Sequence, residues 1–254
     1  MMDPTPDRNP AAPRAAPRPG GAALPSREAA LGDLRRRLRL LEAPASEAGR
    51  AVALGVPALD RALPGGGLVL EALHELAPAT PLDQPAALGF LVVLAGLAVA
   101  PGRPLVLALS RREGPERLDG HGLRGLGLAP ERLVLVEAGD DRGVLRAMEE
   151  GLRSRAPGAV AGCLTDGLEL TASRRLQLAA AGSGAMLLAL RPAGGACANA
   201  AATRWRVGAA QGARDRFGCL AGPRWHLVLE RCRAGNGGAW EVGFDHAAHR
   251  LGLA

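Results

Sequence analysis

The segment from Leu54 to Ala100 constrains the fold of this chain more than any other stretch. It begins with a short amphipathic segment, which is followed by a Pro-Gly-Gly-Gly turn at 64–67 and a strand predicted over 72–76. A loop then connects this strand to an apolar run over 86–100. This run is 15 residues long, whereas a span across a bilayer needs about 20, so it predicts a buried helix and no membrane association. A strand that passes through a loop into a helix is also how a nucleoside-triphosphate site begins.

The loop between this strand and this helix lacks the chemistry that holds phosphates. A phosphate-binding loop uses glycines, which let the backbone approach the anion, followed by a lysine and a Ser or Thr. Residues 77–85 contain three prolines and no glycine, and the chain contains no lysine at all. Proline has no N–H to donate. The sequence therefore predicts no bound nucleotide, no other cofactor and no catalysis here.

Beyond this segment, apolar strands alternate with helical patterns as far as residue 190. Near-continuous apolar runs predict parallel strands that are buried on both faces. From residue 203 onwards, period-two alternation with charge on one face predicts half-buried antiparallel strands. The predicted strands are 105–109, 132–136, 159–164, 185–190, 203–208, 224–231 and 239–244, and the predicted helices are 86–99, 117–126, 144–155 and 171–181. The fold class is therefore α/β, with a mostly parallel sheet flanked by helices and an antiparallel extension over about 200–245.

The first 50 residues differ from the predicted core domain at 51–254. Residues 1–25 hold seven prolines among small and charged residues, which predicts a disordered tail. Residues 26–50 predict a helix and a linker, and four leucines at three- or four-residue spacing form a stripe along that helix: Leu31, Leu34, Leu38 and Leu41. We predict that this stripe, bordered by arginines, binds a partner or a second copy of the chain. Packing on the chain's own core is the alternative.

Positive charge gathers at the two ends of the chain. Residues 1–50 carry nine arginines against six acidic residues and residues 190–254 nine against four, while residues 51–189 carry 13 against 15. Anion binding is therefore expected at the ends. The arginines of the predicted C-terminal strands are candidates for contacts with nucleic-acid phosphates: Arg204, Arg206, Arg224, Arg231 and Arg233. A solvated sheet face is the alternative.

The other candidate site residues form no complete constellation. Glu113 and Glu116 follow a predicted strand, where open α/β sheets bind ligands, and Asp166 follows another. Without a phosphate site, a solvated loop and an ordinary turn are the favoured interpretations. His246 and His249 lie three residues apart with no third ligand nearby, and the four cysteines have no zinc spacing, so we expect no metal. Cysteines without a disulfide pattern and a polar, proline-rich start indicate a cytoplasmic protein.

Several segments are similar to the RecA-type recombinase core. Residues 59–60, 62–68 and 75–78 are similar to the entry of that core, and the stretches 170–180 and 202–207 extend the similarity. In this order they resemble the ImuA family, the RecA-like accessory proteins of the bacterial translesion-synthesis mutasome, over roughly residues 50 to 245. The resemblance implies a RecA-like core.

When the sequence is aligned with a recombinase by this resemblance, the proline-rich loop corresponds to a degenerate phosphate loop. That loop contains Pro78, Thr80, Asp83 and Gln84. Asp83 falls near the position of the recombinase lysine, and Gln84 falls near that of the Ser or Thr. An acid at the lysine position would repel a γ-phosphate. The resemblance therefore implies a chain that is not an enzyme.

The resemblance also implies a function in SOS mutagenesis, the translesion DNA synthesis that is induced as part of the SOS response to DNA damage. The chain would be a scaffold that bridges an ImuB-type homologue of Y-family polymerases and an error-prone replicative-type DNA polymerase, with RecA and DNA as further expected contacts, at the nucleoid. Two alternatives stay open. One is a DNA-dependent, RecA-like ATPase with a divergent nucleotide site, and the other is a plain basic DNA-binding module.

Overall fold

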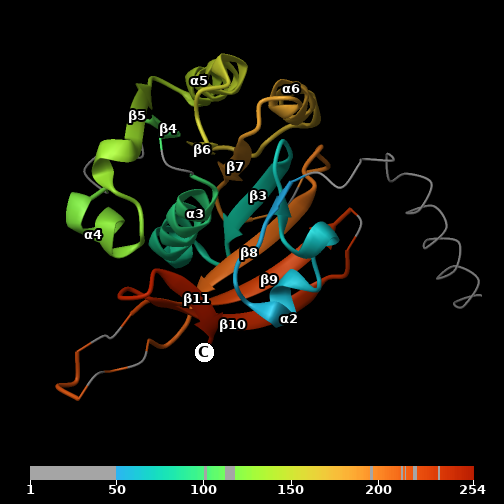
Figure 1. Cartoon of the computed structure of the whole chain (residues 1–254). Helices are drawn as coiled ribbons and strands as arrows, with labels where there is room; N and C mark the ends of the chain where they lie inside the picture. The colour runs from blue at the N-terminus through green and yellow to red at the C-terminus, as the bar shows by residue number, and fades with distance from the viewer. Residues whose placement is uncertain are drawn as a thin grey trace, which may run out of the picture. The chain divides into compact units, whose positions relative to one another are not determined.

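The computed structural model describes residues 50–99, 102–111, 118–194, 197–212, 214, 216–219, 222–233 and 235–254 (Figure 1). Several predictions fall outside these residues. They concern the tail at 1–25, nearly all of the helix and linker at 26–50, and Glu113 and Glu116. The leucine stripe of Leu31, Leu34, Leu38 and Leu41 is among them.

In the part of the chain that the structure describes, nine strands form one sheet in the order β11-β10-β9-β8-β3-β7-β6-β4-β5. The strands are β3 (Leu73–Pro78), β4 (Leu105–Ser110), β5 (Leu133–Ala138), β6 (Ala159–Cys163), β7 (Met186–Leu190), β8 (Thr203–Ala209), β9 (Arg224–Cys232), β10 (Gly238–Asp245) and β11 (Arg250–Leu253). The strands from β8 to β5 run parallel, and β9, β10 and β11 continue the sheet antiparallel. This confirms the predicted α/β class and its antiparallel extension.

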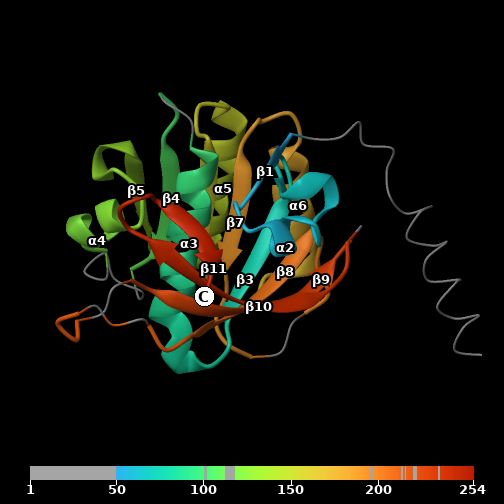
Figure 2. The same cartoon turned by 60° about the horizontal axis from the view of Figure 1, so that its bottom comes forward.

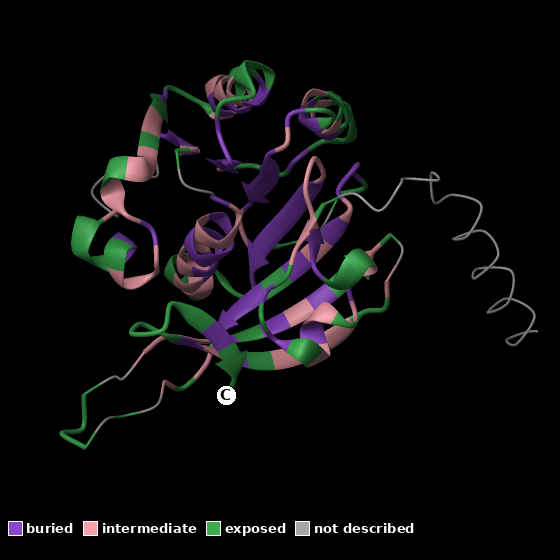
Figure 3. Cartoon of the chain, in the orientation of Figure 1, coloured by how far each residue is buried: buried purple, intermediate pink, exposed green. Residues whose placement is uncertain are grey.

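Helices cover both faces of the parallel strands (Figures 1 and 2). Helix α3 (Gln84–Ala98) packs on one face, whereas α5 (Asp141–Ser154) and α6 (Leu170–Ala180) pack on the other. The strands β3, β6 and β7 are buried along their whole length (Figure 3), which explains their near-continuous apolar sequence. Two shorter α-helices, α2 (Pro57–Asp60) and α4 (Gly120–Gly125), and three 3₁₀ turns, Pro64–Gly66, Pro81–Asp83 and Pro130–Arg132, complete the described helical structure.

Helix α3 is a core helix, as the sequence predicts. By length and composition alone, the stretch Pro81–Ala98 could cross a membrane, but here the side chains from Phe90 to Ala95 are buried. Trp225 of β9 lies against Phe90, with ring centroids 5.5 Å apart, and its Nε1–H donates to the carbonyl of Ala86 (2.8 Å). The helix therefore contacts both the parallel strands and the antiparallel extension.

The structure differs from the predictions at several element ends. Helix α3 begins at Gln84 instead of Ala86, and α4 begins at Gly120 instead of residue 117. Strand β11 and a separate two-stranded sheet, β1 (Ala51–Val52) with β2 (Leu68–Val69), have no counterpart among the predicted elements. Runs of two to four residues are too short for a periodic pattern, so only their pairing partners define them as strands.

Candidate functional site

The segment that connects β3 to α3 lies where a phosphate-binding loop would lie. Its own side chains form hydrogen bonds with its backbone N–H groups. Strand β3 ends at Pro78, and Thr80 caps the 3₁₀ turn Pro81–Asp83 that leads directly into α3. One carboxylate oxygen of Asp83 accepts from the backbone N–H (2.9 Å) and the hydroxyl (2.7 Å) of Thr80. The other oxygen accepts from the N–H of Ala209 on β8 (2.9 Å). Thr80 and Asp83 thus form a capping box, which satisfies N–H groups at the start of the turn.

The backbone of this turn offers few donors to an anion. Pro81 and Pro85 have no N–H. The N–H of Asp83 donates to the carbonyl of Thr80 (3.0 Å), and the N–H of Gln84 donates to the carbonyl of Pro81. Phosphate binding at a helix N-terminus depends on N–H groups that point at the ligand. Here two of these groups are absent, at Pro81 and Pro85, and those of Asp83 and Gln84 are already bonded.

The charge at the turn also opposes phosphate binding. The pKa of the Asp83 carboxyl lies below its ordinary value, chiefly because the N–H of Ala209 donates to the ionised form and secondly because the hydroxyl of Thr80 does. Asp83 is therefore a carboxylate at neutral pH. It supplies a negative charge at the position where a phosphate would need a positive one.

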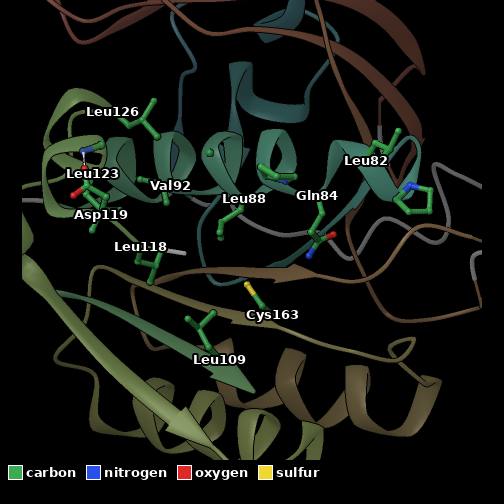
Figure 4. A pocket seen from close by; sticks show the side chains of 14 residues that line it. Leu82, Gln84, Leu88, Val92, Leu109, Leu118, Asp119, Leu123, Leu126 and Cys163 are labelled. Carbon is green, nitrogen blue, oxygen red and sulfur yellow. Dashed lines mark hydrogen bonds between the residues drawn. The ribbon is translucent and has the colours of Figure 1, made fainter. Parts of the chain in front are cut away.

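A pocket of about 640 Å³ lies beside this helix start (Figure 4). It is bounded by α3, α4 and the carboxyl ends of β4 and β6, a common place for ligands in open α/β sheets. Its lining is mostly apolar and includes Leu82, Leu88, Leu109, Leu118, Leu123 and Cys163. The lining carboxylate of Asp119 already accepts from the N–H of Gly122 in α4 (2.7 Å). The pocket therefore suits an apolar group better than a triphosphate.

Asp166, the acid that follows the predicted strand 159–164, lies in an exposed turn after β6. Its N–H donates to Asp141 Oδ2 (2.8 Å), and the N–H of Thr165 donates to Asp141 Oδ1 (2.9 Å). Asp141 thus ties the start of α5 to the end of β6. This arrangement agrees with the interpretation of Asp166 as an ordinary turn residue.

A buried ionic cluster lies on the other face of β3. Glu75 is fully buried, and its Oε1 lies 2.5 Å from Arg191 Nε and 3.1 Å from Arg204 Nε. Asn199 donates its amide N–H to the second carboxylate oxygen, and Arg204 Nη2 donates to the carbonyl of Cys197 (2.7 Å). One carboxylate therefore holds two guanidinium groups beneath the segment that joins β7 to β8. The sequence signal for such a cluster is an acid inside an apolar strand.

This cluster changes the role of Arg204. Its side chain is only 11% exposed and is directed to Glu75. That Arg204 contacts nucleic-acid phosphates stays a prediction, and a phosphate would have to compete with Glu75 for its guanidinium group. Period-two alternation places Arg204 on the face opposite the Trp205 side chain. It does not reveal that an acid from another strand lies on that face.

The other four candidate arginines lie on or directly after β8 and β9. Arg206 is half-exposed and pairs with Glu230 on β9. Arg231 Nη1 donates to the carbonyl of Asn199 (3.1 Å), and Arg233 Nη2 donates to that of Ala200 (2.8 Å). Arg224 is partly buried at the start of β9. That these four contact DNA stays a prediction.

The histidine pair also has structural contacts. His246 and His249 lie in the turn between β10 and β11, and both rings contact Phe244. His246 Nδ1 is 2.6 Å from the carbonyl of Gly125. Among the described residues, no group of three or more His, Cys, Asp or Glu side chains is placed to hold a metal ion.

Comparisons with known proteins place the chain in a family. No protein-family model matches it. The chain is 34% identical to Protein ImuA of Caulobacter vibrioides over 213 residues, in both strain NA1000 / CB15N and strain ATCC 19089 / CIP 103742 / CB 15. The matched part covers 78% of this chain and 85% of Protein ImuA. The crystal structure of SulA from Pseudomonas aeruginosa is 26% identical and covers 48% of this chain and 98% of SulA, with a TM-score of 0.40. By its identity and coverage with the Caulobacter proteins, the chain belongs to the ImuA family.

Proposed function

We propose that this chain is a non-catalytic scaffold for translesion DNA synthesis after DNA damage. It bridges an ImuB-type homologue of Y-family polymerases and an error-prone replicative-type DNA polymerase, and it meets RecA and DNA at the nucleoid in the cytoplasm. Membership of the ImuA family supports the pathway. The observation that carries the non-catalytic part is the Thr80–Asp83 capping box, which occupies the helix start that an ATPase would use for phosphate.

The apolar pocket supports the same proposal. In a RecA-like ATPase the carboxyl ends of the strands must present donors and a metal-binding acid to the triphosphate. Here the corresponding edge presents leucines and prolines beside a carboxylate that is already bonded. Such a surface is better suited to protein contacts than to phosphoryl transfer.

The first test concerns nucleotide. Because the turn before α3 offers few donors and carries a carboxylate, calorimetric titration with ATP and Mg²⁺ should detect no specific binding. Adding single-stranded DNA should elicit no phosphate release. A micromolar dissociation constant that is lost in Asp83→Ala or Gln84→Ala would instead support the divergent ATPase.

The second test concerns partners. Tagged protein expressed with the ImuB-type homologue should capture it, and Leu34→Asp combined with Leu38→Asp should abolish capture, because two charges cannot enter an apolar groove without a large desolvation cost. The melting temperature should hardly change. Leu178→Asp is the matched control, since Leu178 is an exposed leucine on α6, 76% exposed, and its change should leave capture intact. A large fall in melting temperature with capture preserved would show that the stripe packs on the chain's own core.

A further inference from the structure

Strand β5 lies at one edge of the nine-stranded sheet (Figures 1 and 2). Among the residues that the structure describes, only those of β4 form a ladder with it. Two further backbone hydrogen bonds lie at its ends, where Leu133 N–H donates to the carbonyl of Pro130 and the carbonyl of Ala138 accepts from Arg111 N–H (2.9 Å). Within the described part of the chain, the outer side of residues 134–137 has no such bond. It therefore presents N–H and C=O groups to which another strand can pair.

This edge lacks the features that normally keep edge strands from pairing. Natural proteins protect such strands with charged side chains, proline, bulges or short length. The opposite edge, β11, follows this rule, because it has four residues, begins with Arg250 and contains Gly252. Strand β5 has six residues in the order Leu-Val-Leu-Val-Glu-Ala, with one charge and no proline, and pairs with β4 without a register shift. Its edge is therefore a template for pairing with another chain.

The side chains of β5 are also less covered than those of its neighbour. Every side chain of β4 except Val106 is buried, whereas in β5 only Ala138 is buried (Figure 3). Val134 is 46% exposed, and the other three apolar side chains of β5 are partly buried. A strand added at this edge would cover these apolar side chains with its own, which stabilises an antiparallel pair.

We propose that two copies of this chain pair through antiparallel β5 strands, so that their sheets join about a two-fold axis. Opposite residues of an antiparallel pair share one face of the sheet, and side chains alternate between faces along a strand. A two-fold axis perpendicular to the sheet must therefore pass through a residue. An axis at Leu135 places Val134 opposite the partner's Val136 and Leu133 opposite the partner's Glu137. The strand is thus largely complementary to itself, with apolar side chains opposite each other at its centre.

Charge selects this register of the two strands. With the axis at Leu135, the two Glu137 residues lie four residues apart along the strands, about 13 Å at ~3.3 Å per residue, which exceeds a Debye length of about 8 Å at physiological salt. An axis at Val134 would instead place Glu137 opposite the partner's Glu131, and like charges that are directly opposite destabilise a pair. An axis at Val136 would place Glu137 opposite the partner's apolar Leu135.

The two-fold arrangement also explains how the edge is covered. It occupies the open side of β5 in both copies at once, so the assembly closes as a dimer. If β5 paired instead with a different strand of the second copy, each added copy would present a new open edge and the assembly would continue to grow. The proposal concerns an interface between copies of this chain and does not depend on the proposed function.

The test measures the mass of the full chain in solution by light scattering and by analytical ultracentrifugation. Wild-type protein should have twice the chain mass of 26.0 kDa. Val134→Lys and Val134→Glu should each have the mass of a single chain, because charges on an edge strand oppose pairing. Their melting temperatures should hardly change, since Val134 is nearly half exposed. An equimolar mixture of the two variants should recover the doubled mass, because the two-fold axis makes position 134 of each copy a diagonal neighbour of the other.

The matched control is Leu178→Lys, which should keep the doubled mass. Leu178 lies on α6, which contacts β3, and three strands separate β3 from β5. The proposal is overturned by a monomeric wild type at the highest soluble concentration, by a doubled mass in Val134→Lys, or by a mixture of the two variants that stays monomeric. A series of masses that grows with concentration would show open-ended assembly and also overturn it.

Two further measurements separate this interface from the leucine stripe. Leu34→Asp with Leu38→Asp should keep the doubled mass, and if it alone yields single chains, the stripe is the interface between copies and the proposal for β5 is wrong. Capture of the ImuB-type homologue, measured on Val134→Lys, reports on the proposed function separately. Capture should persist in this monomeric variant.

Discussion

Replacing Glu75 with Gln is expected to lower the free energy of unfolding by about 3–5 kcal/mol, the cost of leaving buried charges without their counterion. The carboxylate of Glu75 is fully buried and neutralises Arg191 and Arg204, whose side chains are 5% and 11% exposed. A neutral amide of the same shape keeps the volume but leaves both guanidinium groups unpaired. Urea unfolding, followed by circular dichroism at neutral pH, measures the difference.

Glu131→Gln is the control for this experiment. Glu131 pairs with Arg124, but both side chains are well exposed, at 65% and 63%, so its change should cost less than about 0.5 kcal/mol. Removing the whole charged group with Glu75→Leu, Arg191→Met and Arg204→Met should recover much of the stability, because well-packed apolar residues often replace a buried ion cluster without loss. A cost below about 1 kcal/mol for Glu75→Gln would show that water reaches the cluster.

Lowering the pH from 6.5 to 4 is expected to reduce the free energy of unfolding by about 3 kcal/mol through His74 alone. Burial lowers the pKa of His74 from 6.5 to about 4, partly opposed by its hydrogen bond to the carbonyl of Val69. As the pH falls below 6.5, the unfolded chain binds a proton at this histidine while the folded chain does not. Stability is therefore lost through this window and levels off below pH 4.

The surroundings of His74 fix its neutral form. Because the carbonyl of Val69 can only accept, Nε2 carries the proton and donates to it (2.8 Å), and Nδ1 accepts from the hydroxyl of Thr203 (2.8 Å). The Thr203 oxygen in turn accepts from Trp205 Nε1–H (2.9 Å). His74→Gln should flatten the dependence of the urea midpoint on pH between 6.5 and 4. Replacement of the exposed His226 by Gln should leave it as in wild type, and an equally steep dependence in His74→Gln would exclude His74 as its source.

The sequence predicts most of the sheet because the apolar pattern changes where the strand direction changes. The runs at 105–109 and 185–190 are apolar throughout and become β4 and β7, which are covered on both faces. The alternation at 204–207 becomes β8, whose neighbour β9 is antiparallel. Local patterns report how many faces of a strand are covered, and this is enough to separate the parallel part from the extension.

What the sequence does not reveal about the candidate site depends on contacts between distant residues. Arg204 has the same alternation as Arg206, but only Arg204 lies opposite the carboxylate of Glu75, 129 residues earlier in the chain. That contact requires β3 to lie beside β8 and the segment after β7 to cover both, and neither fact is present in the local pattern. The proline-rich loop, by contrast, is predicted as unable to hold phosphate because donors are missing from the residues themselves.

The place of β3 in the sheet bears on how the chain folds as it is made. Its neighbours are β7 and β8, and 129 residues separate His74 from Thr203, its register partner on β8. A nascent chain therefore emerges from the ribosome with β3 and the apolar helix α3 long before either neighbouring strand exists. Pairings so distant in sequence form slowly and leave apolar strand edges exposed in the meantime. Synthesis of this protein consequently includes a long interval in which β3 has been made but neither of the strands that pair with it has.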